Sequence, residues 1–259
     1  MCSAFRNALL ATALLVAAGS DARDLRVCAD PDNLPFSSED GRGFENRIAE
    51  LVAAHLHADL TYYWLPDRRG FLRKTLGAHA CDVVIGLPVE SERALTTPAY
   101  YRGTYVFVYR GDRLGPLASL DDPRLSTLRV GVALVGNDLA ATPPAMALAQ
   151  RGLTQNVTGF PMFGETSIGE RMTRALRDDT IDVAVLWGAQ AGYYARATEP
   201  TLTVTPIAAK EGVTSTFDIA MGVRRDDPQL HGQLVEALSA LKPRIDAVLD
   251  SYAVAREPL

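Results

Sequence analysis

Two segments of this chain, a hundred residues apart, share one pattern. Each contains the end of an amphipathic helix, a short turn and an apolar run led by Asp-Val; the segments are Arg73–Ile85 and Thr173–Val185. Short apolar runs of this kind are typical of buried strands in parallel sheets. Each run ends at a glycine-containing loop, Gly86-Leu87-Pro88 or Trp187-Gly188. The repetition predicts an α/β protein with two small βαβαβ lobes.

The ends of corresponding strands in two such lobes predict a cleft. Open α/β sheets bind ligands in the crevice outside the carboxyl ends of their strands. We expect lobe 1 to comprise residues 23–108 and 216–259, and lobe 2 to comprise residues 109–215. One strand near 105–109 carries the chain into lobe 2, and another at 217–223 brings it back. Two crossing strands are typical of a hinge.

Apolar periodicity predicts the individual elements. The expected strands are 25–29, 60–65, 81–86, 128–132, 157–161 and 181–186. The expected helices begin near residue 44, span 68–77, end at Gly152 and begin after Ser167, where Ser167 and Glu170 form a capping box. The C-terminal region is predicted to form two helices, because proline disrupts helix interiors and Pro243 lies within the periodic segment.

Residues 1–22 have the composition of a secretory signal peptide. Arg6 supplies the positive start, residues 8–18 are almost purely apolar, and Ser20-Asp21-Ala22 offers small residues for cleavage. The apolar stretch is shorter than the roughly 20 residues that a membrane-spanning helix needs. We therefore expect a periplasmic protein with no membrane insertion after cleavage.

Charge and cysteine content narrow the class further. A net charge of −5 argues against binding to nucleic acids or anionic membranes. Cys2 leaves with the signal peptide, so the exported chain keeps Cys28 and Cys81. Both lie near the start of strands expected to be neighbours, and their spacing fits neither a metal site nor a redox Cys-x-x-Cys motif. A structural disulfide is the prediction.

Catalytic patterns are absent from the sequence. None of the four histidines accompanies a Ser or Cys nucleophile motif, and the sequence contains neither a His-Glu-x-x-His motif nor a P-loop. The run Asp30-Pro31-Asp32-Asn33 lacks the glycine and the final glutamate of a calcium-binding loop. We predict no catalytic residue, no metal and no cofactor.

Binding features are more numerous, because aromatic and polar residues gather at the expected strand ends. Each aromatic could instead belong to a lobe core, and Arg93 could either clamp a ligand carboxylate or pair with Glu90 and Glu92 at the surface. The predicted cleft residues are Asp30, Asn33, Phe36, Trp64, Arg68, Pro88, Arg93, Tyr100, Tyr101, Asn137, Trp187 and Tyr193.

Several motifs resemble a known family. Gly43-Phe44-Glu45, Cys81–Gly86, Glu90–Arg93 and Pro98–Tyr101 are similar to those of family 3 extracellular solute-binding proteins, the periplasmic amino-acid-binding components of ABC importers. This resemblance implies the two-lobed periplasmic-binding-protein type II fold.

A narrower resemblance is carried by Val27–Ser37, Gly43–Asn46, Arg68–Phe71, Tyr100–Val108 and Ala184–Gly188. These segments resemble the quinoprotein-dehydrogenase-associated binding proteins, which include the J protein of methanol-oxidation operons. The resemblance implies a non-enzymatic accessory or maturation partner of a PQQ-dependent methanol or alcohol dehydrogenase, or of its cytochrome c. An importer's substrate-binding component for a small polar solute is the alternative, and a lyase on the same fold is a third hypothesis.

Two departures argue against amino-acid binding. By resemblance, amino-acid binders hold the ligand carboxylate with an arginine at the position of Arg93 and the ammonium with an aspartate at the position of Trp187. An indole attracts a cation only weakly. Leu134–Asp138 also replaces the hydrogen-bond-donating loop that such binders carry. We therefore expect about half of the contacts that bind a zwitterionic amino acid to be missing.

Overall fold

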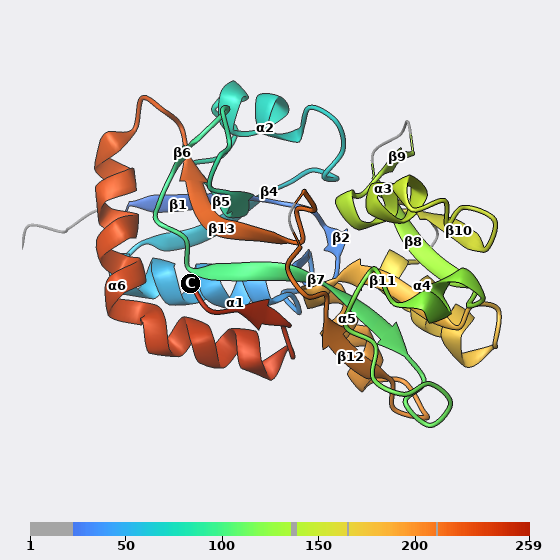
Figure 1. Ribbon diagram of the computed structural model, residues 1–259. Coiled ribbons are helices and arrows are strands. Elements are labelled where there is room, and N and C mark those ends of the chain that lie inside the picture. Colours follow the sequence, from blue (N-terminus) through green and yellow to red (C-terminus); the bar gives the residue numbers. More distant parts are fainter. Residues whose placement is uncertain (1–22, 136–138, 165, 211) are drawn as a thin grey trace, which may run out of the picture.

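Two α/β lobes make up the computed structural model, which describes residues 23–135, 139–164, 166–210 and 212–259. The lobes lie side by side and are connected by the long strand β7 (Figure 1). The predicted signal peptide, residues 1–22, lies outside the described residues.

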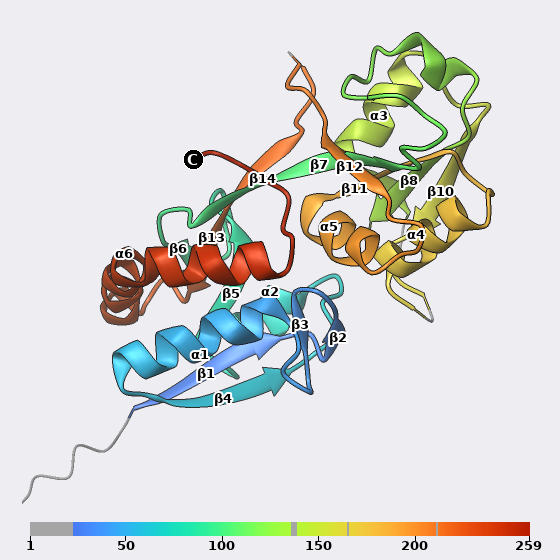
Figure 2. The ribbon, with the colours of Figure 1, turned by 90° about the horizontal axis from the view of Figure 1, so that it is seen from below.

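Lobe 1 is built on a sheet in the order β13-β5-β1-β4. The strand β1 pairs in parallel with β4 and β5, whereas β13 is antiparallel to β5. Helices α1 and α6 pack against each other on one face of this sheet (Figure 2). The bounds are β1 Asp24–Ala29, α1 Phe44–Leu56, β4 Asp59–Trp64, β5 Val83–Pro88, β13 Thr216–Val223 and α6 Pro228–Ser251.

Lobe 2 repeats this plan with the order β10-β8-β11-β7. Half of the predicted capping box is present: the Ser167 hydroxyl accepts a hydrogen bond from the Glu170 backbone N–H at 3.2 Å, whereas the Glu170 carboxylate pairs with Arg174 at 2.6 Å. The bounds are β8 Val130–Val135, α3 Pro143–Gln150, β10 Val157–Pro161, α4 Ile168–Arg177, β11 Val183–Trp187, α5 Gly188–Arg196 and β12 Thr203–Pro206.

The strand β7 (Tyr101–Tyr109) belongs to both lobes. Its first half pairs with β13, up to Thr104 opposite Thr216, and its second half pairs with β11 from Tyr105 opposite Trp187. The chain returns to lobe 1 between β12 and β13. The pairing of β7 therefore changes from lobe 1 to lobe 2 at one peptide, and α5 adds contacts between the lobes, such as the stacking of Tyr193 on Tyr252. The lobe boundaries at residues 108 and 216 stay a prediction.

Short elements complete the fold and mostly flank the main strands. They are β2 Asp32–Asn33, β3 Ser37–Ser38, α2 Phe71–Lys74, the 3₁₀ turn Leu76–Ala78, β6 Leu95–Thr96, the 3₁₀ turn Pro123–Ser126, β9 Ala140–Ala141 and β14 Arg256–Glu257.

Three sequence predictions about helices were wrong. The helix α6 continues through Pro243 instead of ending there. Leu241 and Ile245 are buried on either side of this proline, and the packing of that face outweighs the roughly 3 kcal/mol cost of an internal proline. The helix expected over 68–77 is reduced to α2 and a 3₁₀ turn, and α5 begins directly at Gly188, where a loop was expected.

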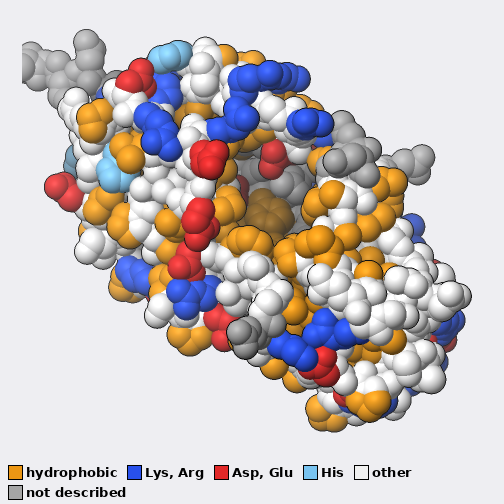
Figure 3. All heavy atoms as spheres, turned by 45° about the horizontal axis from the view of Figure 1, so that its top comes forward, with side chains coloured by type: hydrophobic (Ala, Val, Ile, Leu, Met, Phe, Trp, Pro, Cys, Tyr) orange, Lys and Arg blue, Asp and Glu red, His pale blue; other side chains and the backbone are white. Residues whose placement is uncertain are grey.

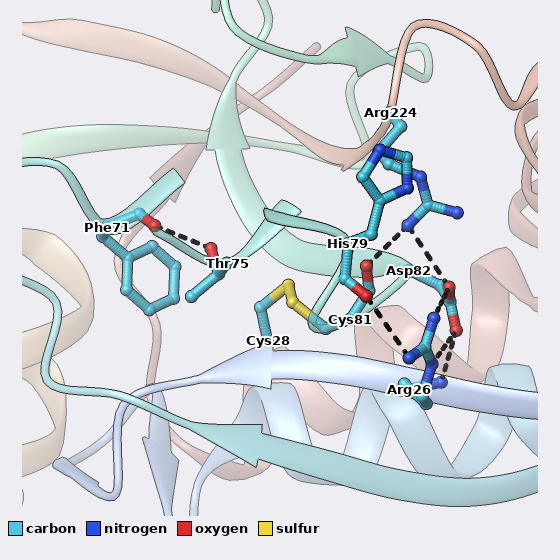
Figure 4. Close-up of a disulfide and its surroundings, with 8 residues drawn as sticks. All are labelled: Arg26, Cys28, Phe71, Thr75, His79, Cys81, Asp82 and Arg224. Carbon is cyan, nitrogen blue, oxygen red and sulfur yellow. Dashed lines mark hydrogen bonds and ion pairs between the residues drawn. A yellow bond between two sulfur atoms is a disulfide. The ribbon is translucent and has the colours of Figure 1, made fainter. Parts of the chain in front are cut away.

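The predicted disulfide joins Cys28 of β1 to Cys81, just before β5, with the two Cα atoms 5.5 Å apart (Figure 4). Beside it, Asp82 accepts hydrogen bonds from Arg26 and Arg224 (Figure 4). Burial opposes ionisation of Asp82, but these hydrogen bonds and charges outweigh it and hold its pKa below the usual value. Covalent and ionic contacts thus join the neighbouring strands β1 and β5 of lobe 1.

No helix within the described part of the chain is long and apolar enough to span a membrane.

Candidate functional site

A cleft of about 720 Å³ lies between the two lobes and is lined by residues of both. Figure 3 shows a hollow on this face, with hydrophobic side chains on its floor and acidic side chains along one rim. The strands β1, β5 and β11 end at the cleft, as the rule for open α/β sheets predicts.

One wall of the cleft is aromatic and lies at the junction of the lobes. The Trp187 indole packs edge-on against Tyr105 (ring centroids 5.1 Å apart) and at a tilt against Phe217 (5.9 Å). Gly103 in β7 makes room for this indole, because a Cβ there would lie 2.1 Å from Trp187 Cζ2. Burial raises the pKa of Tyr105 to about 12, so this wall is uncharged at neutral pH.

Lobe 1 contributes carboxyl groups to the opposite wall: Asp30, Asp32, Glu45 and Asp67 all line the cleft. Asp30 is held in place because its two carboxylate oxygens accept the backbone N–H groups of Asp32 at 2.9 Å and Asp67 at 2.6 Å. Burial and the Asp30 charge raise the pKa of Asp67. This wall therefore presents an excess of acidic groups.

Glu45 reaches the cleft from the first turn of α1. The start of this helix is fixed by the buried Asn46, whose side-chain oxygen accepts the backbone N–H groups of Ser38 and Gly43 at 3.0 and 3.1 Å. The Glu45 carboxyl lies against Gly86 at the end of β5, where an added Cβ would come within 2.2 Å of Glu45 Oε1. A glycine at this strand end is therefore needed for the carboxyl to occupy its place.

The Glu45 carboxyl has no hydrogen-bond donor among the described residues. Burial, and secondarily the Asp67 charge, raise the pKa of Glu45 to about 8. A carboxyl group with this pKa is mostly protonated near pH 7, and a cation close to it would favour its ionised form.

Lobe 2 supplies two notable side chains to the cleft. Gln190, in the first turn of α5, is only 4% exposed, lines the cleft and makes no side-chain hydrogen bond to another described residue. Phe163 carries the Arg68 guanidinium over its ring, with Arg68 Cζ 3.4 Å from the ring centroid. This contact joins the lobes across the cleft and engages the one arginine of the described cleft lining.

Seven of the residues predicted from sequence line the cleft. They are Asp30, Asn33, Phe36, Arg68, Pro88, Tyr101 and Trp187. Their contribution to ligand binding stays a prediction.

Four other predicted residues lie away from the cleft lining. Trp64 stacks on Tyr62, with ring centroids 4.5 Å apart, and Tyr193 stacks on Tyr252 at 6.0 Å. Tyr100 is buried, and its hydroxyl donates to the Ile85 carbonyl at 3.2 Å. Arg93 is exposed on the surface. The remaining predicted residue, Asn137, lies outside the described residues.

Six residues that line the cleft were not among those predicted from the sequence: Glu45, Asp67, Tyr105, Phe163, Gln190 and Phe217. For Glu45 a signal was present, because it stands in the Gly-Phe-Glu-Asn motif quoted for the resemblance. An acidic residue in the first turn of a helix is, however, equally expected from the helix dipole. For Phe163 and Gln190 no pattern in the sequence distinguishes cleft from surface or core.

Within the described parts of the chain, no group of three or more His, Cys, Asp or Glu residues is placed to hold a metal ion.

Comparisons with known proteins agree on one family. No protein-family model matches the chain. It is 34% identical to the protein MoxJ of Methylorubrum extorquens, over 92% of this chain and 83% of that protein. It is 30% identical to MoxJ of Paracoccus denitrificans, over 94% of this chain and 93% of that protein.

Among solved structures, the periplasmic binding protein XoxJ from Methylobacterium extorquens AM1 superposes with a TM-score of 0.77. It is 35% identical to this chain, and the match covers 91% of this chain and all of XoxJ. These relationships confirm the predicted two-lobed periplasmic-binding-protein fold. The chain belongs to the MoxJ family of solute-binding-like proteins.

Proposed function

We propose that this protein is a non-enzymatic periplasmic accessory protein that binds a PQQ-dependent alcohol dehydrogenase, or its cytochrome c, and helps to mature or activate it. Membership of the MoxJ family supports this proposal, together with the motifs shared with quinoprotein-dehydrogenase-associated proteins. A periplasmic location agrees with the solved relative XoxJ, a periplasmic binding protein.

The observation that carries the proposal is the character of the cleft. Its wall of Trp187, Tyr105 and Phe217 offers large rigid apolar surfaces, which anchor protein segments at a small cost in side-chain entropy. The arginine in the described lining, Arg68, already lies over the Phe163 ring and is therefore not positioned to bind an amino-acid carboxylate. A protein segment suits this surface better than a free amino acid does.

Co-purification tests the proposal directly. Tagged protein is recovered at low ionic strength from the periplasm of the cells that produce it, and the proteins retained are compared with those from an empty-tag control. We expect a quinoprotein dehydrogenase or a cytochrome c to be enriched. Enrichment of neither, with a small metabolite that raises the melting temperature of the purified protein, would favour the importer alternative.

A further inference from the structure

We propose that the cleft binds a primary ammonium group on an apolar stem, with the charge paired to the Glu45 carboxylate and the stem laid against Trp187, Tyr105 and Phe217. Such a group is found in a free alkylamine and in a lysine side chain. Where the lysine belongs to the dehydrogenase, the inference rests on the proposed function; where the ligand is a free amine, it does not.

The distribution of charge in the cleft favours a cationic ligand. Four carboxyl side chains and one arginine belong to the described lining, and that arginine, Arg68, already lies over the Phe163 ring. Even with Glu45 protonated, three aspartates face a single arginine in the described lining, so an anion is disfavoured there and a cation is attracted. The Arg68–Phe163 contact also places a cation on an aromatic face within this cleft.

Each lobe also places in the cleft a polar side chain that makes no hydrogen bond to another described residue. The Glu45 carboxyl reaches the cleft beside Gly86 without a hydrogen-bond donor from the described residues. Gln190 faces the same space from lobe 2, buried to 96% and without a side-chain hydrogen bond within the described chain. The Glu45 carboxyl and the Gln190 side-chain oxygen are therefore acceptors that a ligand with N–H groups can use in this cleft. An ammonium group has three donors and no acceptor.

Protonation of Glu45 adds a measurable signature. The titratable groups that interact with it electrostatically are Asp67, after β4, Tyr62 on β4, Tyr100 just before β7, and Tyr101 at the start of β7. The tyrosines remain neutral because burial raises the pKa of each. A bound ammonium lowers the pKa of Glu45, so binding below about pH 8 releases a proton. Affinity is therefore expected to rise with pH between 6 and 8 and then level off.

Calorimetry on the purified mature protein tests the proposal without the dehydrogenase, so its result is independent of the accessory role. The cationic probes are n-butylammonium, for a free amine, and Nα-acetyl-lysine N-methylamide, for a lysine side chain. Their neutral counterparts are 1-butanol and Nα-acetyl-norleucine N-methylamide. We expect at least one cationic probe to bind at least about tenfold more tightly than its neutral counterpart, because a charge-assisted hydrogen bond is worth about 1.5–3 kcal/mol.

The variant Glu45→Gln is expected to weaken binding of that probe at least about tenfold and to remove the rise in affinity between pH 7 and 8. Glu50→Gln is the matched control, because Glu50 lies exposed on the same helix and its hydrogen bonds go to Arg47. Binding of n-butylammonium alone assigns the site to a free amine, and binding of the lysine probe alone assigns it to a protein segment. Unchanged binding by Glu45→Gln, equal affinity for the neutral probes, or no binding of either cation at millimolar concentration would overturn the proposal.

Discussion

Replacing both Cys28 and Cys81 with serine is expected to lower the free energy of unfolding by roughly 4 kcal/mol. The bridge joins residues 53 apart in sequence, and in the chain-entropy model a cross-link of that span removes this much conformational freedom from the unfolded chain. Both cysteines are buried and belong to a small core cluster with Phe71 and Leu76, so the substitution also places hydroxyl groups in apolar surroundings.

Urea denaturation of the mature protein, followed by circular dichroism, measures this loss. The unsubstituted protein in a reducing agent is the matched control, because it loses the bond but keeps the cysteine side chains. We expect the reduced protein to account for most of the loss. A double variant within about 1 kcal/mol of the oxidised protein would show that the surrounding contacts, including those of Asp82, hold β1 and β5 together without the bond.

Free standard amino acids are expected to bind no more tightly than millimolar. Trp187 stands where amino-acid binders are expected to carry an aspartate, and it cannot neutralise a ligand ammonium. The structure, however, places carboxyl groups elsewhere in the cleft and Arg93 on the surface. The missing contacts are therefore those that would bind the ligand carboxylate. Without them, a zwitterion brings its carboxylate into a cleft whose described lining holds three aspartates and one arginine already engaged with Phe163. The difference between millimolar and micromolar binding amounts to about 4 kcal/mol.

Calorimetry with the standard amino acids measures this expectation, and Nα-acetyl-lysine N-methylamide serves as the matched probe without a free carboxylate. An amino acid that binds at low micromolar affinity, and that is weakened by Arg93→Ala or Arg68→Ala, would contradict the expectation. That outcome would support an importer component.

Much of the fold could be predicted from local patterns. Apolar runs such as 183–187 mark the buried strands, and Ser167 marks the start of α4, because these signals depend only on near neighbours in sequence. The helix break predicted at Pro243 was wrong because long-range contacts outweigh the local signal. Local propensity predicts a break there, whereas contacts with residues far away in sequence keep α6 continuous.

The candidate site was less predictable because an aromatic residue does not reveal which face of its element it occupies. Trp64 and Trp187 both stand at strand ends, yet the structure brings Trp187 into the cleft lining and stacks Trp64 on Tyr62. The role proposed for Glu45 depends on its contact with Gly86, and that contact exists only once α1 has packed against β5. Such pairings are properties of the folded chain.

The most direct test of the accessory role measures the affinity of the purified mature protein for the purified quinoprotein dehydrogenase with which it co-purifies. Phe163→Ala removes a ring from the cleft and leaves the buried cores intact, and Tyr63→Ala removes an exposed ring from β4 as the matched control. We expect Phe163→Ala to weaken binding at least about tenfold, because aromatic anchors of this kind contribute 2 kcal/mol or more, and Tyr63→Ala to leave it unchanged. Absence of binding by the unsubstituted protein, or equal affinity for the two variants, would contradict a role in which this cleft holds the dehydrogenase.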